Sequence, residues 1–292
     1  RDRRGPMVSS GGNSKRTAGL TCAVVFNAAG GLTTSQMYVG IASLAAQRLR
    51  MTATHMPSAC ATFCVRLFVE DPVAQLLRRT KLADAWDSID TYPPIPPISS
   101  ARSSARSSRS KHYQGTERGW LLRISALLAS KEDLLAFMDS DVMACDGWPD
   151  LFDWFAHSGL DVASTKPSAP FSGSLGNSQL PAPFGMEKAS MPDWANFAER
   201  NLGFGLLRRS RPAVQELLER FQLEFIRIAN DTTLPMNADQ TAWRAALWWG
   251  VRNGTSVGKV KERIIAPSRS CRPLTSFFRH LAIRYGNASC GP

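Results

Sequence analysis

LLAFMDSDVMAC, residues 134–145, is an apolar run that leads into two aspartates one residue apart, Asp139 and Asp141. Alternate residues of a strand point the same way, so a strand over 134–138 delivers both carboxylates to one side of its carboxyl end. Open α/β sheets bind ligands at that edge. Two carboxylates repel unless a cation joins them, and hard divalent cations prefer oxygen ligands. The stretch therefore predicts a metal site that can hold phosphates; the alternative is a solvated turn after a strand.

The segments before this stretch predict a parallel α/β start. TCAVVFN (21–27) and FCVRLFVED (63–71) are compact apolar runs typical of strands. Between them lies a helical pattern opened by Thr33 or Thr34, and a strand, a helix and a strand at this spacing favour a parallel βαβ unit. That helix carries on one face Met37, Ile41, Leu44 and Ala45. Further helices are expected over 73–89 and 117–130, from Pro149, from Ser210 and from near Asn237, and further strands over 160–164, 201–210 and 257–266.

Length and composition fit one large α/β domain or two small ones, and we expect a single domain over 19–292. The chain has 292 residues, 43% of them hydrophobic, with eight tryptophans, enough for a globular core. Residues 1–18 are basic and rich in Gly and Ser, and we expect a disordered tail. Residues 92–112 are rich in Pro, Ser and Arg and are expected to form an insertion outside the core, and 165–198 is expected to be a long loop.

The charge balance and the termini leave several partners open. With 35 basic and 24 acidic residues the chain carries +11, which suits polyanions, a phosphate-bearing substrate, an anionic membrane or simply a solvated surface. The Arg/Ser run lacks interleaved aromatic residues, so we expect no nucleic-acid partner. No run of about 18 apolar residues is present. The sequence begins with Arg1, and one alternative is a fragment that lacks its N-terminal membrane anchor or signal.

The cysteines and the glycosylation sequons indicate in which cellular compartment the protein resides. Six cysteines form no paired CxxC array, which argues against structural zinc, and Cys271 and Cys290 are candidates for a disulfide. Three N-x-S/T sequons begin at Asn230, Asn253 and Asn287. They favour the Golgi or another secretory lumen, with a cytoplasmic protein with free thiols as the alternative.

Other residues can contribute to a site at the same edge. Arg123, one helix upstream of the aspartates, can neutralise a diphosphate, and Asp71 can accept a hydrogen bond from a base or ribose, although an aspartate before proline is also a common turn former. Gly203 and Gly205 permit close backbone approach. Asp239 and Gln240, at the start of a predicted helix, are further candidates, but each also has a structural explanation. Asn237 and Gln240 have capping-box spacing, and Asp239 suits the first turn of a helix.

Taken together, the chain resembles the nucleotide-diphospho-sugar transferases of the GT-A glycosyltransferase fold. The matching order is RGWLLRISALLASKEDLLAFMDSDV (118–142), then ERNLGFGLLRRS (199–210), then a helix, then NADQTAW (237–243). The resemblance covers about 20–290 with gaps and is poor over 92–116 and 165–198. It implies a Rossmann-like, mixed, mostly parallel sheet flanked by helices.

The resemblance also implies roles for individual residues. Asp139 contacts the ribose or the metal, Asp141 binds Mn²⁺ or Mg²⁺, Asp71 contacts the nucleoside and Arg123 the phosphates. The family normally has a metal-ligand histidine near its C-terminus, for which His280 is the candidate in this chain. The donor-sugar and acceptor side is lined by Asn201, Gly203, Asp239 and Gln240.

The implied activity is hexosyl or pentosyl transfer from a nucleotide-diphosphate sugar to a hydroxyl of a glycan or glycoprotein acceptor. The resemblance leans to retention at the anomeric carbon; inversion would require a base, with Asp239 and Asp193 as candidates. One alternative is a haloacid-dehalogenase-like phosphatase, but its motif normally opens the first strand and has Thr or Val where this chain has Met143. Another is a non-catalytic basic module for glycans or nucleic acid, whose affinity would fall steeply with salt.

Overall fold

The computed structural model describes most of the region expected to fold. The described residues are 19–29, 32–53, 55–98, 116–140, 142–144, 147–165, 182–197, 200, 202–231, 238–260 and 278–280. The predicted tail at 1–18, Asp141, Asn201, both residues of the candidate Cys271–Cys290 pair and most of the predicted insertion lie outside them.

A seven-stranded sheet in the order β3-β2-β1-β4-β7-β6-β8 forms the centre of the molecule. The β3, β2, β1 and β4 strands run parallel, β7 is antiparallel to both β4 and β6, and β8 is parallel to β6. The predicted mixed, mostly parallel α/β sheet is therefore confirmed. The strands are β1 (Leu20–Ala28), β2 (Cys60–Val69), β3 (Ser88–Thr91), β4 (Leu134–Met138), β6 (Val162–Ser164), β7 (Phe204–Arg208) and β8 (Val257–Lys259), with a separate pair of β5 (Val142–Ala144) and β9 (Phe278–His280).

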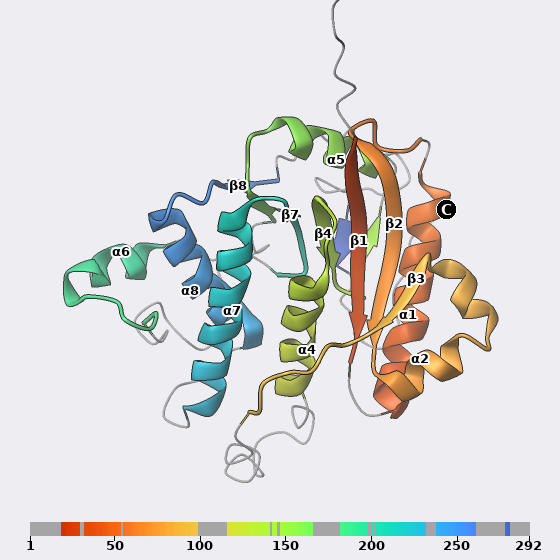
Figure 1. The fold of residues 1–292 in the computed structure, drawn as a ribbon, viewed down its shortest axis with the longest axis horizontal. Helices are drawn as coiled ribbons and strands as arrows, with labels where there is room; N and C mark the ends of the chain where they lie inside the picture. Colours follow the sequence, from red (N-terminus) through yellow and green to blue (C-terminus); the bar gives the residue numbers. More distant parts are fainter. Residues whose placement is uncertain are drawn as a thin grey trace, which may run out of the picture.

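Helices cover both faces of this sheet. Side chains of α4 (Thr116–Ala129), α7 (Pro212–Asn230) and α8 (Ala238–Arg252) pack on one face, and Figure 1 shows these three helices side by side. Side chains of α1 (Leu32–Met51), α2 (Asp71–Leu77) and α5 (Trp148–His157) pack on the other. The remaining described elements are α6 (Met191–Asn196) and the 3₁₀ segments η1 (Lys81–Ala85) and η3 (Lys188–Ser190). The prediction of a long loop over 165–198 is therefore wrong for 188–196. No described helix is both long and apolar enough to cross a membrane.

The pleat of the strands explains the two cores. In β1, Val24 and Phe26 belong to the core beneath α1 and α5, whereas Ala23 and Val25 belong to the core beneath α4, α7 and α8. Every residue of β4 is buried, as expected for a strand covered on both faces. β4 is thus a rigid central support for the residues that follow it.

Helix α1 turns a different face to the sheet from the one that its large residues suggest. Met37 and Leu44 are 54% and 57% exposed, whereas Ala42, Ala45 and Ala46 are fully buried. Small side chains let the helix axis approach the sheet closely, so large residues at the same positions would hold it away. Of the predicted apolar face of Met37, Ile41, Leu44 and Ala45, Ala45 is buried, and the prediction is wrong for Met37 and Leu44.

The helix predicted over 73–89 is shorter and is followed by a strand. Helix α2 ends at Leu77, η1 covers Lys81–Ala85, and β3 begins at Ser88. The Asp87 carboxylate accepts a hydrogen bond of 2.7 Å from the Val65 backbone N–H, which holds the chain at the start of β3. A parallel edge strand therefore replaces the last helical turns.

The start of the predicted insertion contributes to the core. Residues 92–98 form neither helix nor strand, and Tyr92, Ile95 and Ile98 pack against the core beneath α4, α7 and α8. The expectation that 92–112 stays outside the core is thus wrong for these three residues, whose apolar side chains recur at every third position. Residues 99–112 lie outside the described residues.

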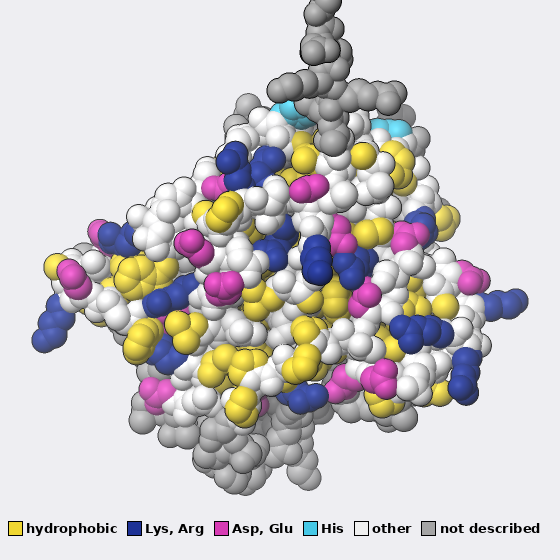
Figure 2. All heavy atoms as spheres, in the orientation of Figure 1, with side chains coloured by type: hydrophobic (Ala, Val, Ile, Leu, Met, Phe, Trp, Pro, Cys, Tyr) yellow, Lys and Arg dark blue, Asp and Glu magenta, His cyan; other side chains and the backbone are white. Residues whose placement is uncertain are grey.

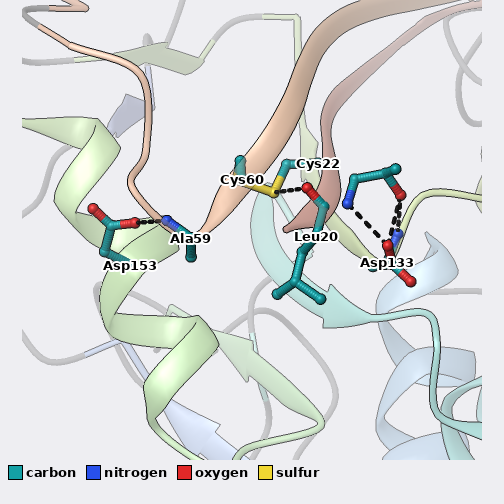
Figure 3. The surroundings of a disulfide bond; sticks show 7 residues. Leu20, Cys22, Ala59, Cys60, Asp133 and Asp153 are labelled. Atoms are coloured by element: carbon teal, nitrogen blue, oxygen red, sulfur yellow. Dashed lines mark hydrogen bonds between the residues drawn. A yellow bond between two sulfur atoms is a disulfide. The ribbon is translucent and has the colours of Figure 1, made fainter. Parts of the chain in front are cut away.

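A disulfide that the sequence analysis did not anticipate joins β1 to β2. Cys22 and Cys60 are bonded across neighbouring parallel strands, with their Cα atoms 5.8 Å apart (Figure 3). Aspartates flank the bond: Asp133 accepts hydrogen bonds from the Thr21 backbone N–H at 2.9 Å and hydroxyl at 2.8 Å, and Asp153 accepts one from the Ala59 N–H at 2.7 Å. These bonds tie the amino-terminal edge of the sheet together.

Candidate active site

Arg123 is the centre of a charged cluster at the carboxyl edge of the sheet. Helix α4 carries it, and its guanidinium forms ion pairs with the carboxylates of Asp139 and Asp239, the latter at 2.9 Å. Its Nε also donates a hydrogen bond of 3.2 Å to the Asn27 side-chain oxygen. Asn27 lies near the end of β1, Asp139 follows β4, and Asp239 lies in the first turn of α8. Three segments far apart in the sequence therefore converge on one arginine.

Asp139 is held by its backbone as well as by its side chain. Strand β4 stops at Met138, as predicted, and the Asp139 N–H then donates a hydrogen bond of 2.8 Å to the carbonyl of Gly203. The Val142 N–H donates one of 3.0 Å back to the Asp139 carbonyl, so the chain turns directly after the strand. Asp139 thus opens a fixed turn. Asp141 lies outside the described residues.

Asp239 is the most deeply buried acid of the cluster, with only 5% of its surface exposed. Burial raises the pKa of the Asp239 carboxyl, because removal from water penalises the charged form. The charge of Arg123 and backbone N–H groups at the start of α8 oppose that rise. The Asp239 carboxylate therefore depends on its cationic neighbour to remain charged.

Gln240, Gly203 and Gly205 were all predicted to face a ligand, but the structure gives them different surroundings. The Gln240 side-chain nitrogen is buried and has no hydrogen-bond partner among the described residues, so it is a donor available to a ligand. Gly203 supplies the carbonyl that fixes Asp139. At Gly205, a Cβ would collide with the ring of Phe137, so this glycine serves close packing and not the approach of a ligand that was predicted for it.

The other predicted site residues are not brought into the cluster by the described structure. Asp71 is exposed at the start of α2 and accepts a hydrogen bond of 2.9 Å from Gln75, which accords with the turn-forming alternative. Asn201 lies outside the described residues. For His280 only the backbone is described: in β9 it pairs with Val142 of β5, next in sequence to Asp141. This register is the one observation that brings the C-terminal segment near the aspartates.

Two residues of the cluster were missed in the sequence. Asn27 is a polar residue at the end of the apolar strand β1, and that position was the signal that could have found it. Tyr92 interacts with both Asn27 and Arg123, and burial raises its pKa. Its contribution could not be found in the sequence, because it depends on residues 92–98 packing against the core.

A second cluster of ligand-type side chains lies elsewhere. His55, Asp150 and Asp153 each place one potential ligand atom within 4.8 Å of the others, the one such group of three among the described residues. Asp153 accepts a hydrogen bond from Ala59, which directly precedes β2, so this group lies at the amino-terminal edge of the sheet. It does not supply ligands to the Arg123 cluster at the opposite edge.

Comparison with known proteins finds similarity only at the level of structure. No protein-family model matches the chain, and no curated protein matches it. The chain is similar to a crystal structure of the galactosyltransferase LgtC in complex with donor and acceptor sugar analogues. The alignment covers 87% of this chain and 81% of the LgtC chain, with 13% identity and a TM-score of 0.46. An active-site mutant of LgtC has the same coverage, with 15% identity and a TM-score of 0.45.

Proposed function

We propose that this chain is a GT-A-type glycosyltransferase that moves a hexosyl or pentosyl group from a nucleotide-diphosphate sugar to a hydroxyl of a glycan or glycoprotein. The observation that carries the proposal is the cluster of Arg123, Asp139 and Asp239 at the carboxyl edge of the sheet. Ligands of open α/β sheets bind at that edge. An arginine between two acids there can exchange an aspartate for a phosphate, which makes the same charged, planar contact.

The cofactor that we propose is Mn²⁺ or Mg²⁺. We propose Asp139, Asp141 and His280 as its ligands, which would combine two carboxylate oxygens with an imidazole nitrogen. Support comes from the turn that begins at Asp139 and from the β5–β9 pairing, which places the His280 backbone opposite Val142. When bound, the ion supplies positive charge that stabilises the departing nucleoside diphosphate.

The chain's own residues would bind and orient the donor. Arg123 neutralises phosphate charge, and Asn27 holds its guanidinium in place through Nε. Gln240 offers its unpaired side-chain amide to a sugar hydroxyl. Asp239 then acts as an orienting acceptor. Asp193, the other candidate base, pairs with Arg252 at 2.7 Å, at the far end of α8 from Asp239.

Asp71, Asn201 and Gly203 also have proposed roles in binding the donor. We assign Asp71 to the nucleoside side and Asn201 with Gly203 to the donor sugar. Gly203 has structural support, because its carbonyl fixes Asp139. Asp71 has less, since its carboxylate is engaged by Gln75.

We further propose the Golgi or another secretory lumen as the compartment. The disulfide between Cys22 and Cys60 requires oxidising conditions, which are rare in the cytosol. Two of the sequon asparagines, Asn230 and Asn253, are exposed at the ends of α7 and α8. On the face in view in Figure 2, basic side chains are interspersed with acidic and hydrophobic ones, so this face offers no continuous basic surface for nucleic acid.

The test is a panel of UDP- and GDP-sugars with Mn²⁺, read as release of free nucleoside diphosphate. We expect turnover with at least one donor, loss of turnover on chelation, and loss in Asp141→Asn with an unchanged circular dichroism spectrum. An active Asp141→Asn variant would remove the proposed metal ligand. Hydrolysis of a generic phosphate ester without any nucleotide-sugar turnover would favour the phosphatase alternative instead.

A further inference from the structure

A cavity lies between the first half of α7 and the last turn of α8. Its volume is about 260 Å³, and its lining includes Glu216, Leu217, Arg220, Trp249, Asn253 and Thr255. Asp239 and Trp249 are ten residues apart on α8, which is about 15 Å along a helix. The cavity is therefore separate from the Arg123 cluster, and the proposed function does not use it.

The cavity combines an aromatic ring with unpaired polar groups. Trp249 is half-buried, and the Arg220 guanidinium lies 4.7 Å from its ring centroid. Glu216 and Asn253 are exposed, and in the described structure neither side chain has a hydrogen-bond partner. Figure 2 shows hydrophobic, basic and acidic side chains close together over α7 and α8. The lining therefore offers an apolar surface beside a free acceptor and a free amide.

The shape of the cavity depends on two glycines. A Cβ at Gly250 would lie 2.9 Å from a methyl carbon of Leu217 and 3.1 Å from the Thr255 hydroxyl, so this wall is already closely packed. Gly254 has a φ of 87°, a left-handed conformation that other residues rarely adopt. The turn it forms brings Asn253 and Thr255 together in the lining.

We propose that this cavity binds one or two sugar rings of a glycan. A pyranose presents apolar C–H groups to an aromatic ring and hydroxyls to carboxylate and amide groups, the chemistry found here. The volume is below the roughly 300–1,000 Å³ of sites for drug-sized ligands, which suits a smaller ligand. Glu216 and Arg220 balance each other in the lining, and Arg220 is also paired with Glu224, so the cavity has no net positive charge to hold a phosphate. The choice of a glycan over another polyol rests on the proposed transferase function.

Two sources can supply that sugar. One is the acceptor glycan, which would reach the cavity along α8 from the reaction site. The other is a glycan on this chain itself: Asn253, Gly254 and Thr255 form a sequon, and the Asn253 side chain is exposed at the cavity. An N-linked glycan rooted there would place its first sugars beside Trp249.

The experiment uses the full chain produced in a eukaryotic secretory host, without nucleotide or metal. Peptide mass spectrometry reports whether Asn253 carries a glycan, and saturation-transfer NMR reports binding of chitobiose, lactose, cellobiose and mannobiose. We expect at least one disaccharide to bind to the same chain made in a bacterial periplasm, where the disulfide forms but no N-linked glycan is added to Asn253. We expect Glu216→Gln to weaken that binding at least tenfold and Ala213→Leu, which fills the cavity, to abolish it. The matched control is Glu219→Gln, the same change one turn along α7 and outside the cavity.

The outcomes separate the two sources and test the proposal itself. If Asn253 is glycosylated and disaccharides bind only to the chain made without N-linked glycan, the chain's own glycan occupies the cavity; if the chain from the secretory host is unmodified and binds them, the acceptor does. The proposal is overturned if no disaccharide binds to the chain made without N-linked glycan at millimolar concentration, or if Glu216→Gln and Glu219→Gln bind equally well. Disaccharide binding without nucleotide-sugar turnover would contradict only the proposed transferase activity.

Discussion

The two edges of the central sheet both carry aspartates, but these aspartates are held by different partners. At the amino-terminal edge, Asp133 and Asp153 accept hydrogen bonds from backbone N–H groups near the Cys22–Cys60 disulfide. At the carboxyl edge, Asp139 and Asp239 share the side chain of Arg123. Backbone donors cannot leave, whereas a side-chain cation can exchange one anion for another. The first edge is therefore held more firmly, and the second is where we propose that a ligand replaces one of the aspartates.

The largest effect on stability should come from removing the shared cation. Arg123→Met leaves two carboxylates close together, one of them buried, and we expect a loss of about 3–5 kcal/mol in the free energy of unfolding. Adding Asp239→Asn should recover much of that loss, because it removes the buried charge. Urea unfolding followed by circular dichroism measures both.

The matched control for Arg123 is an exposed ion pair. Arg50 and Asp87 are 2.7 Å apart with both side chains 41% exposed, so Arg50→Met should cost less than about 1 kcal/mol. Equal losses at Arg123 and Arg50 would contradict the idea that the Arg123 cluster is electrostatically special.

Substitution of an aspartate should lower nucleotide-sugar turnover strongly at the carboxyl edge and very little at the amino-terminal edge. Asp139→Asn should lower nucleotide-sugar turnover by about 100- to 1,000-fold, the effect of losing one group that stabilises developing charge. Asp133→Asn should lower stability by about 1–3 kcal/mol through weakened hydrogen bonds to Thr21 and leave turnover near that of wild type. The measurement is nucleoside diphosphate release beside thermal unfolding. If the two variants lose turnover equally, the distinction between the edges fails.

The disulfide gives a further test of the amino-terminal edge. Cys22→Ala with Cys60→Ala removes a link across a sequence separation of 38 residues, and we expect a loss of about 2–4 kcal/mol. Turnover measured well below the melting temperature should persist, because the bond lies at the edge opposite to Arg123. Loss of turnover in a still-folded variant would show that the two edges are coupled.

Most of the central sheet could be predicted, because its signals are local. Strand β4 was found as an apolar run, and α8 as a helix that begins near Asp239. The pairing of Arg123 with Asp239 could not be found, since it joins residues 116 apart and depends on how α4 and α8 pack. The disulfide between Cys22 and Cys60 was missed for the same reason: only the pairing of β1 with β2 brings the two sulfurs together.

The errors arose where packing overrides local pattern. In α1, large apolar residues indicated the buried face, but small alanines face the sheet and Met37 lies outside. The segment 92–98 looked like the start of a solvated insertion, yet Tyr92 packs beside the Arg123 cluster. Residue type alone does not tell which of two apolar faces a close-packed sheet will accept.

The smallest predicted effect is a pH dependence that belongs to the carboxyl edge. Burial raises the pKa of Asp239 in the native state above the value of about 4 expected for the unfolded chain. Between those two pKa values the native state binds more protons than the unfolded state. Stability therefore falls as pH rises through this window, by at most about 1.4 kcal/mol per pH unit.

Asp239→Asn removes that titration, so its comparison with wild type isolates the effect. Unfolding free energies of both proteins, measured in urea from pH 4 to pH 8, should give a wild-type-minus-variant difference that falls as pH rises. A difference that rises instead would mean that the charge of Arg123 outweighs burial and holds the pKa of Asp239 below its unfolded value. The carboxyl edge would then be a stable ion-pair site like any other, since its buried acid would gain nothing from a change of partner.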